Sequence, residues 1–345
     1  MRADTRISDQ ARLDNLLRQT SRTFAINIPM LPGELRQALT LGYLLLRNAD
    51  TLEDAYRWPK QRRLDALEAY LALLRAPDPR AAQRFADEMA SAEGIEPPFH
   101  HALLLETPFL LDQLHRMPEA YTREVLAHVE RVVRRMQGWV GNHDESNRLQ
   151  IHRLSELDDY CYSVAGIVGE LITSLIALYR PALDGTRLLL LRTLETGVGA
   201  GLQLTNIIKD AFRDHLEGRY YIPREYLPLD GARVPERMRP IIAYAYRHLC
   251  LGVEYACALP ERETDIRKAV LVPLMLAAAT LVRLYERVED LFSGAEVKIS
   301  REAVGEILIL VDQIAGENGR VREAWRQVSG PLLDLPGGCA PAVNA

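Results

Sequence analysis

The sequence predicts an all-α protein, and three observations predict it. Apolar residues recur at spacings of three and four over long stretches, which is the period of an amphipathic helix. No stretch sustains an alternation of apolar and polar residues, and no Asn-Gly or Asp-Gly turn joins two such runs, so strands are not indicated. Prolines fall between the periodic stretches, where they end helices.

The individual helices follow from this periodicity in chain order. Residues 61–75 show it plainly, with leucines at 64, 67, 71 and 74, and residues 123–140 continue it with a basic outer face. A long helix is predicted over 156–179, entered at Ser155 and carrying two aspartates in its first turns. The remaining helices are predicted over 188–216, 236–258, 262–291 and 303–327.

Composition indicates an ordinary globular protein. Of 345 residues, 48% are hydrophobic and 26% are charged. The formal net charge of −5 argues against a nucleic-acid partner, although local basic residues can still bind phosphates. No composition shift or repeat marks a boundary, so we expect one domain over residues 1–328 and a loosely ordered tail over 329–345.

The sequence also sets expectations about membranes and redox state. The first residues are too polar for a signal peptide. The most apolar run, 270–282, is shorter than the roughly 20 residues that cross a bilayer, so a buried helix is expected there. The four cysteines form no CxxC pair, so neither a zinc site nor a disulfide framework is indicated, and a reducing compartment fits.

Carboxylates stand out in two places where apolar residues surround them. Asp50, Glu53 and Asp54 follow the apolar run YLLLRN and share one helix face, with Arg47 three positions earlier. In the stretch 202–223 a second row forms at spacings of four. It consists of Asn206, Asp210 and Asp214, extended one turn back by Gln203.

Two interpretations of these acids compete. Most single carboxylates are solvated on helix surfaces. Flanking apolar residues imply partial burial, however, and an unpaired buried carboxylate costs several kcal/mol. Mg²⁺ prefers oxygen ligands and is commonly held by one or two carboxylates, waters and substrate phosphates. Two acidic rows that face each other would therefore bind Mg²⁺ and a diphosphate.

Four blocks of sequence carry a resemblance to a known family. They are SRTF at 21–24, YLLLRNADTLED at 43–54, YCYSVAGIVG at 160–169 and LQLTNIIKDAFRDHLEGRYYIP at 202–223. Together they resemble the squalene synthase branch of the squalene/phytoene synthase family, over roughly residues 15–300. The order of acids in DTLED is more similar to squalene synthases than to phytoene or dehydrosqualene synthases.

The resemblance implies a fold, a reaction and a location. The fold is the all-α isoprenoid synthase fold, a single helical bundle around a central cavity with an acidic cluster on each wall. The reaction joins two farnesyl diphosphates head to head into presqualene diphosphate and reduces this to squalene with NADPH, in sterol or hopanoid biosynthesis. The eukaryotic membrane anchor has no counterpart here, so the resemblance implies a cytoplasmic enzyme with peripheral contact at the inner face of the plasma membrane.

The resemblance also assigns roles to residues. It implies Mg²⁺, or Mn²⁺ in its place, at Asp50, Glu53, Asp54, Asn206, Asp210 and Asp214. It implies substrate contacts from Ser21, Arg22, Phe24, Tyr43, Arg47, Gln203, Lys209 and Arg219. Tyr160 is expected to assist proton removal or stabilise a carbocation, beside the catalytic acids Asp50, Asp54, Asp210 and Asp214. Ser21 could instead cap a helix, and Tyr43 and Tyr160 could pack in a core.

The chain departs from the family pattern in places. Arg213 stands where an acid is expected, and Lys209 replaces a usual arginine with a point charge. The segment 292–302 resembles a nicotinamide-associated segment, which makes Lys298 and Arg301 candidate cofactor contacts, although a solvated charged loop explains it equally well. The tyrosine-asparagine pair expected nearby is Tyr285-Glu286.

Several alternatives remain open from the sequence. GVGAG at 197–201 lacks the last glycine of GxGxxG and lies within a helical pattern, so a Rossmann site is rejected. Its small residues, like Ala165, Gly166 and Gly169, would let helices or a prenyl chain approach closely. The enzyme could stop at presqualene diphosphate, make dehydrosqualene or cyclise one diphosphate. A non-catalytic scaffold would be expected to have lost its acids, which are present here.

Overall fold

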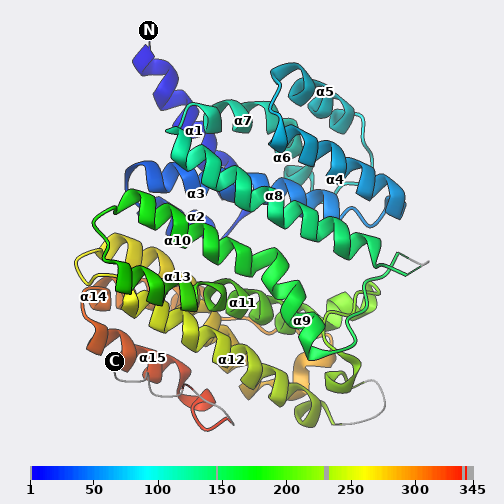
Figure 1. Cartoon of the computed structure of the whole chain (residues 1–345). Helices are drawn as coiled ribbons and strands as arrows, with labels where there is room; N and C mark the ends of the chain where they lie inside the picture. The colour runs from blue at the N-terminus through cyan, green and yellow to red at the C-terminus, as the bar shows by residue number, and fades with distance from the viewer. Residues whose placement is uncertain (1, 145–146, 229–232, 336–338, 340–345) are drawn as a thin grey trace. The chain divides into compact units, whose positions relative to one another are not determined.

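The computed structural model describes residues 2–144, 147–228, 233–335 and 339, and they are helical nearly throughout (Figure 1). Over these residues the one strand-like pairing is an isolated bridge between Gln150 and Tyr220. The prediction of an all-α protein is therefore confirmed. The chain divides into two compact units, residues 1–147 with 174–181 and residues 148–173 with 182–345. Each unit is described by itself.

The first unit is built around one long apolar helix, α3. Its helices are α1 (Arg2–Thr20), α2 (Phe24–Asn27), α3 (Gly33–Glu53), α4 (Lys60–Arg75), α5 (Pro79–Ala90), α6 (Pro98–Leu105), α7 (Thr107–His115) and α8 (Glu119–Gly141). Helix α3 contacts α1, α4, α6, α7 and α8. Leu41, Leu44 and Leu45 are therefore fully buried. Each such side chain stabilises the fold by about 1.5–3 kcal/mol.

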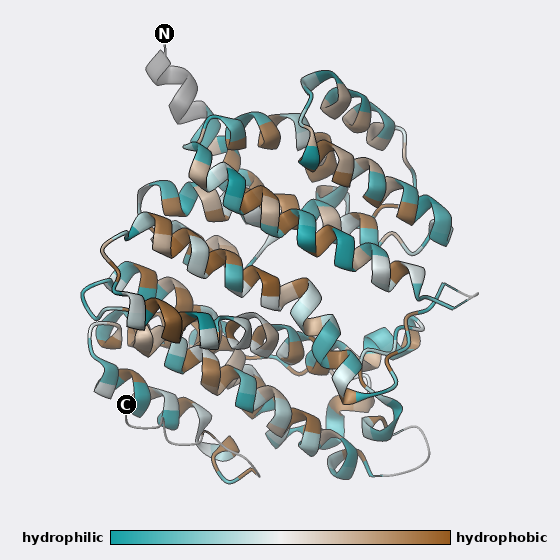
Figure 2. Cartoon of the chain, in the orientation of Figure 1, coloured by the Kyte–Doolittle hydropathy of each residue, from teal (hydrophilic) through white to brown (hydrophobic). Residues whose placement is uncertain are grey.

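The second unit is organised around the long pair α11 and α12. It contains α9 (Leu154–Cys161), a π-helical turn (Tyr162–Gly166), the first turns of α10 (Ile167–Tyr179), α11 (Gly185–Leu216), α12 (Val234–Ala258), α13 (Thr264–Glu286), α14 (Arg301–Ile314) and α15 (Asn318–Ser329). Helix α12 packs on α11, α13 and α15. Along most of these helices polar and apolar residues recur in turn, as expected of helices with one buried and one exposed face (Figure 2).

The predicted helices differ from the observed ones mainly where short interruptions occur. The segment 156–179 is broken by the π-helical turn Tyr162–Gly166, a local widening that is frequent at functional sites. The segment 262–291 ends at Glu286, after which a 3₁₀ helix covers Val288–Phe292. The segment 303–327 is two helices, because α14 ends at Ile314 and α15 begins at Asn318. Helical periodicity persists across such short breaks, so it does not reveal them.

Two helices are long and apolar enough to cross a membrane by length and composition, residues 154–179 and 264–286. In the most apolar window of each, 56% and 67% of the residues are buried inside the protein. Core helices of soluble proteins pass the same test, so this finding is weak evidence for a membrane span. The expectation that 270–282 lies in a buried helix is met, since Val272, Leu274 and Met275 of α13 have no exposed surface.

The cysteines depart from expectation. Cys250 of α12 and Cys339 form a disulfide, whereas Cys161 and Cys257 are free and buried. The sequence indicated no disulfide, because the partners lie 89 residues apart in no recognisable spacing pattern. The prediction of a loose tail over 329–345 partly lies outside the described residues. Within them, Ser329 and Leu332 are fully buried.

Candidate active site

The first acidic row lies at the end of α3. Asp50 and Glu53 are on its last turn, and Asp54 caps its C-terminus. The Arg47 guanidinium lies 3.1 Å from the Asp50 carboxylate. It also donates to the Tyr43 hydroxyl over 3.2 Å, and that hydroxyl donates to the Thr20 carbonyl over 2.9 Å. The structure therefore brings the predicted residues of this helix together as one charged face.

Two carboxylates of this row, Asp50 and Glu53, lie where negative charge is disfavoured. Burial raises the pKa of Asp50, and Arg47 lowers it only in part. Burial raises the pKa of Glu53 well above its usual value, and the charges of Asp54 and Asp50 raise it further. Such crowding of like charges is relieved by protons or by a cation. A bound divalent cation would therefore offset the crowded negative charge of this row.

The sequence did not single out the residue that contacts the backbone of this row at Glu53. Arg63 of α4 is completely buried and donates to the Glu53 backbone carbonyl. It also donates to Asn147 Oδ1 over 2.9 Å and lies 3.2 Å from His143 Nδ1. Burial and Arg63 lower the pKa of His143 to about 4, so this histidine is neutral. Arg63 sits in the helix 61–75, where we noted only the leucine pattern.

The SRTF block lies beside Tyr43. The Ser21 hydroxyl accepts a hydrogen bond from the Phe24 amide over 2.9 Å, in the turn that leads into α2, whose N-cap position is Thr23. The Phe24 and Tyr43 rings pack with centroids 5.2 Å apart. Arg22 is exposed. This block therefore packs an aromatic ring, Phe24, against Tyr43 of the first row. A phosphate contact from Ser21 would compete with the hydrogen bond that Ser21 accepts from the Phe24 amide.

The second acidic row lies on the last turns of α11, with a basic partner for each aspartate. Asp210 lies 3.2 Å from Arg213 and 3.6 Å from Lys209. Lys209 also donates to Asn206 Oδ1 over 3.2 Å. Gln203 is half-buried one turn earlier. Arg213, which departs from the family pattern, thus forms an ion pair with Asp210 and does not replace it.

Asp214 and Arg219 form the most buried ion pair of this row. The Arg219 guanidinium lies 2.6 Å from the Asp214 carboxylate, and the two side chains are 15% and 11% exposed. The Arg219 amide also donates to the Asp214 carbonyl over 2.8 Å. Burial raises the pKa of Asp214, although the hydrogen bond from Arg219 opposes this. Arg219 is therefore held next to the row by both backbone and side chain.

A small pocket opens beside this pair, lined in part by Asp214, His215, Arg219 and Tyr221. His215 was not singled out from the sequence, and its Nδ1 is buried without a hydrogen-bond partner in the described structure. The Tyr221 ring also packs on Tyr160, with centroids 5.0 Å apart. Tyr160 is 5% exposed. The second unit therefore places Tyr160 next to the pocket that Asp214 and Arg219 line.

Glycines let α11 approach the π-helical turn. A Cβ on Gly199 would lie 1.9 Å from the Ala165 carbonyl oxygen, and one on Gly169 would lie 2.0 Å from the Glu195 carbonyl oxygen. Neither position can hold a side chain without moving backbone. The interpretation of GVGAG as close helix packing inside a helix is confirmed, and this packing fixes the turn that directly follows Tyr160 and Cys161.

The candidate cofactor contacts, Lys298 and Arg301, are exposed at the surface of the second unit. Lys298 pairs with Glu296 over 2.7 Å, with side chains 68% and 73% exposed. Ser300 caps α14 by accepting from the Ala303 amide, and Arg301 begins that helix. Glu286, which replaces the expected asparagine, pairs with Arg283 over 3.1 Å. Lys298 ahead of the helix and Arg301 in its first turn bring two positive charges that suit a bound phosphate.

The donor set of the two rows suits Mg²⁺ in kind. It consists of carboxylate and amide oxygens, the ligands that hard divalent cations prefer. Among the described residues, no three acid, histidine or cysteine side chains converge as a ready-made metal site. Magnesium sites in diphosphate enzymes commonly take one or two carboxylates from the protein and fill the rest with water and phosphate oxygens.

Comparison with known proteins decides the family. The family model described as squalene/phytoene synthase matches residues 17–303, most of the chain. The chain belongs to the squalene/phytoene synthase family. The four sequence blocks and both acidic rows lie inside the matched residues. The resemblance inferred from those blocks is therefore confirmed, and with it a family of prenyltransferase-type enzymes.

Curated relatives in the squalene/phytoene synthase family are squalene synthases. The chain is 26% identical over 307 residues to the squalene synthase of Cyberlindnera jadinii, covering 85% of this chain and 66% of that protein. It is 27% identical over 299 residues to the squalene synthase of Homo sapiens, covering 83% of this chain and 65% of that protein. The chain thus spans slightly less than two thirds of the length of these relatives.

Solved structures show the same fold. A complex of TcSQS with the ligand E5700 has a TM-score of 0.75 and 25% identity, covering 94% of this chain and 91% of that chain. Squalene synthase HpnC from Alicyclobacillus acidocaldarius has a TM-score of 0.54 and 20% identity, covering 81% of this chain and 94% of that one. The prediction of the isoprenoid synthase fold is confirmed.

Proposed function

We propose that this chain is a squalene synthase, which joins two farnesyl diphosphates head to head into presqualene diphosphate and reduces that product to squalene with NADPH. The observation that carries the proposal is the α3 row. Burial raises the pKa values of Asp50 and Glu53 there, and repulsion from Asp54 and Asp50 raises that of Glu53 further, beside an arginine on the same face. This arrangement suits a cation-bridged diphosphate and costs stability without one.

The residues that would hold Mg²⁺ are Asp50, Glu53, Asp54, Asn206, Asp210 and Asp214. Bound Mg²⁺ supplies Lewis-acid stabilisation of the diphosphate oxygens as the allylic carbon–oxygen bond breaks. That the two rows face one another stays a prediction from the sequence.

The arginines and Lys209 would bind phosphate oxygens directly. Arg47 and Arg219 are each held by a carboxylate and by a second contact, so their guanidinium groups are oriented before a ligand arrives. An oriented guanidinium binds phosphate through charge-assisted, paired hydrogen bonds. Lys209 and Arg22 are exposed and would add charge at the edge of the site.

Tyr160 would act on the hydrocarbon end of the substrate. Its ring packs on that of Tyr221, and Tyr160 is 5% exposed while Tyr221 is half-buried. Aromatic faces stabilise a nearby carbocation, and a dry environment keeps water from quenching it. The Tyr160 hydroxyl would receive or hold the proton lost during formation of the cyclopropane ring.

The reductive step rests on weaker geometry. Lys298 and Arg301 would hold the phosphates of NADPH, which supplies the hydride when it is bound. The Glu296–Lys298 pair and the Arg283–Glu286 pair compete with that role. These contacts favour a second candidate function, an enzyme that stops at presqualene diphosphate or forms dehydrosqualene.

We also propose a cytoplasmic location with peripheral contact at the inner membrane face, which membrane fractionation would test.

Product analysis tests the proposal. The full chain is incubated with farnesyl diphosphate and Mg²⁺, with and without NADPH, and extracted products are identified by mass spectrometry. We expect squalene in the tube with NADPH and presqualene diphosphate in the tube without it. Presqualene diphosphate in both tubes would favour the second candidate. Absence of any coupled product, in protein whose helical fold is verified by circular dichroism, would contradict both.

A further inference from the structure

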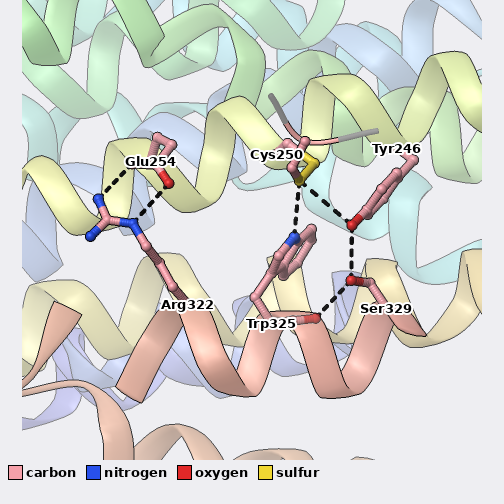
Figure 3. The surroundings of a disulfide bond; sticks show 7 residues. Tyr246, Cys250, Glu254, Arg322, Trp325 and Ser329 are labelled. Atoms are coloured by element: carbon pink, nitrogen blue, oxygen red, sulfur yellow. Dashed lines mark hydrogen bonds and ion pairs between the residues drawn. A yellow bond between two sulfur atoms is a disulfide. The ribbon is translucent and has the colours of Figure 1, made fainter. Parts of the chain in front are cut away.

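The Cys250–Cys339 disulfide fastens the C-terminal segment to two helices of the second unit. Tyr246 and Cys250 lie one turn apart on α12, and Trp325 and Ser329 lie one turn apart on α15 (Figure 3). The Tyr246 and Trp325 rings stack nearly parallel, with centroids 5.9 Å apart. Cys339 adds its sulfur to this cluster, with its Cα 5.6 Å from that of Cys250.

We propose that Cys250 and Cys339 form a reversible redox modification site, at which a small thiol or dithiol opens the disulfide and the corresponding small disulfide closes it again. Exposure makes the bond accessible, since Cys339 lies at the surface while Cys250 is 8% exposed. Structural disulfides are rare in reducing compartments, and exposed disulfides there exchange with the thiol pool.

The hydrogen-bond surroundings suit both redox states. The Ser329 hydroxyl donates to the Trp325 carbonyl over 2.7 Å, so its oxygen accepts the Tyr246 proton over 2.9 Å. In the disulfide, the Cys339 sulfur accepts from the Trp325 indole over 3.3 Å. In the thiol state, its S–H can donate to the Tyr246 oxygen, 3.5 Å away. Neither state leaves Cys339 without a partner.

The exchange balances without any group beyond the named thiol. A thiolate attacks the exposed Cys339 sulfur, the sulfur–sulfur bond breaks, and its electron pair leaves on Cys250, which then takes up a proton. A second thiol attacks the mixed disulfide at the reagent's sulfur and releases Cys339 as a thiol. Two thiols are oxidised to one small disulfide, and one protein disulfide is reduced to two cysteines.

The other two cysteines are internal controls. Burial raises the pKa of Cys257 to about 11 and raises the pKa of Cys161 as well. Thiols that remain protonated and buried react slowly. The redox response is therefore confined to Cys250 and Cys339.

Opening the disulfide would loosen the chain end and leave the helices in place. The Arg322 guanidinium holds Glu254 with two hydrogen bonds of 3.1 and 2.7 Å, which joins α15 to α12 without the disulfide (Figure 3). Tyr246 and Ser329 join the same helices. After Ser329, the 3₁₀ turn Gly330–Leu332 packs on α13, whereas Cys339 is joined to α12 by the disulfide.

Thiol counting tests the chemistry. The folded full chain is equilibrated with oxidised or reduced dithiothreitol, quenched with acid, denatured, alkylated and analysed by peptide mass spectrometry. Of the four cysteines, we expect Cys161 and Cys257 alone to be labelled after oxidation, and all four after reduction. Labelling of all four after oxidation would overturn the disulfide. Unlabelled Cys250 and Cys339 after native reduction would overturn its exchange with thiols.

Limited proteolysis tests the consequence. The chain has no lysine or arginine after Arg326, so trypsin reports on the rest of the fold, while cleavage by a leucine-directed protease after Leu332, Leu333 and Leu335, identified by mass spectrometry, reports on residues 332–335. Reduction should speed leucine-directed cleavage of this segment roughly tenfold and leave tryptic cleavage unchanged. Cys339→Ser should be cleaved fast under both conditions, and Cys257→Ser should respond as the wild type does. Equal rates for oxidised and reduced wild type would contradict the proposal.

Discussion

The two acidic rows carry similar charges along their helices and differ in how many basic side chains pair with their carboxylates. On α3, burial raises the pKa values of Asp50 and Glu53, the neighbouring acids raise that of Glu53 further, and Arg47 offsets the shift of Asp50 only in part. On α11, Asp210 lies against Lys209 and Arg213, and Asp214 lies against Arg219. The comparison teaches that the first row gains most from an added cation. In the second row, the basic side chains that pair with the aspartates would have to turn toward a bound diphosphate.

The largest expected effect comes from removing one acid from either row. Asp50→Asn and Asp210→Asn should each lower turnover at least about 100-fold, because each removes an anionic metal ligand while keeping the side-chain shape. The measurement is the rate of farnesyl diphosphate consumption with Mg²⁺. Circular dichroism provides the control for folding. Near-normal turnover in either variant would remove that row from the site.

Stability should separate the rows. Asp50→Asn should leave the free energy of unfolding at neutral pH unchanged or slightly higher, because the raised pKa of Asp50 means that its folded site disfavours charge. Arg219→Gln should lower it by about 1–3 kcal/mol, because it strands the buried Asp214. Urea unfolding without metal measures both. In the double variant Arg219→Gln/Asp214→Asn, much of the lost stability should return, while activity stays low.

Lys298 should have a smaller and more selective effect than either row. Lys298→Ala should lower squalene formation about tenfold and leave presqualene diphosphate formation unchanged, because this exposed cation would contact only the cofactor. Product ratios at limiting NADPH measure it. The control variant Lys268→Ala removes a half-buried lysine that pairs with Asp312 elsewhere in the second unit and should change neither step. An equal loss of both products in Lys298→Ala would reject the cofactor role.

The smallest effect should be a pH dependence of stability that arises from His143, next to Arg63. Burial and Arg63 lower the pKa of His143 from 6.5 to about 4, so the unfolded chain binds more protons between these values. Stability is therefore lost as pH falls from about 6.5 toward 4. His143→Gln should flatten this slope between pH 6.5 and 5 in thermal unfolding. An unchanged slope would place the acid sensitivity elsewhere.

Helical periodicity and four blocks predicted the fold and the family. They also predicted which residues would share a face, since Arg47 and Asp50 are three apart on one helix and Asp210 and Asp214 are four apart on another. They could not predict contacts between segments distant in sequence. Arg63 behind Glu53, Tyr221 against Tyr160 and Cys339 on Cys250 each depend on tertiary packing. The π-helical turn was equally invisible, because one extra residue per turn barely disturbs an apolar pattern.

The central claim is that both rows take up a divalent cation together with a diphosphate. The most direct measurement is the thermal unfolding midpoint of the full chain titrated with Mg²⁺ and inorganic diphosphate, for wild type, Asp50→Asn and Asp210→Asn. A ligand that binds only the folded state raises stability by about 2.7 kcal/mol at 100 times its Kd. We predict a clear rise for wild type that each variant largely loses. No rise for wild type, or an equal rise in all three proteins, would contradict the account.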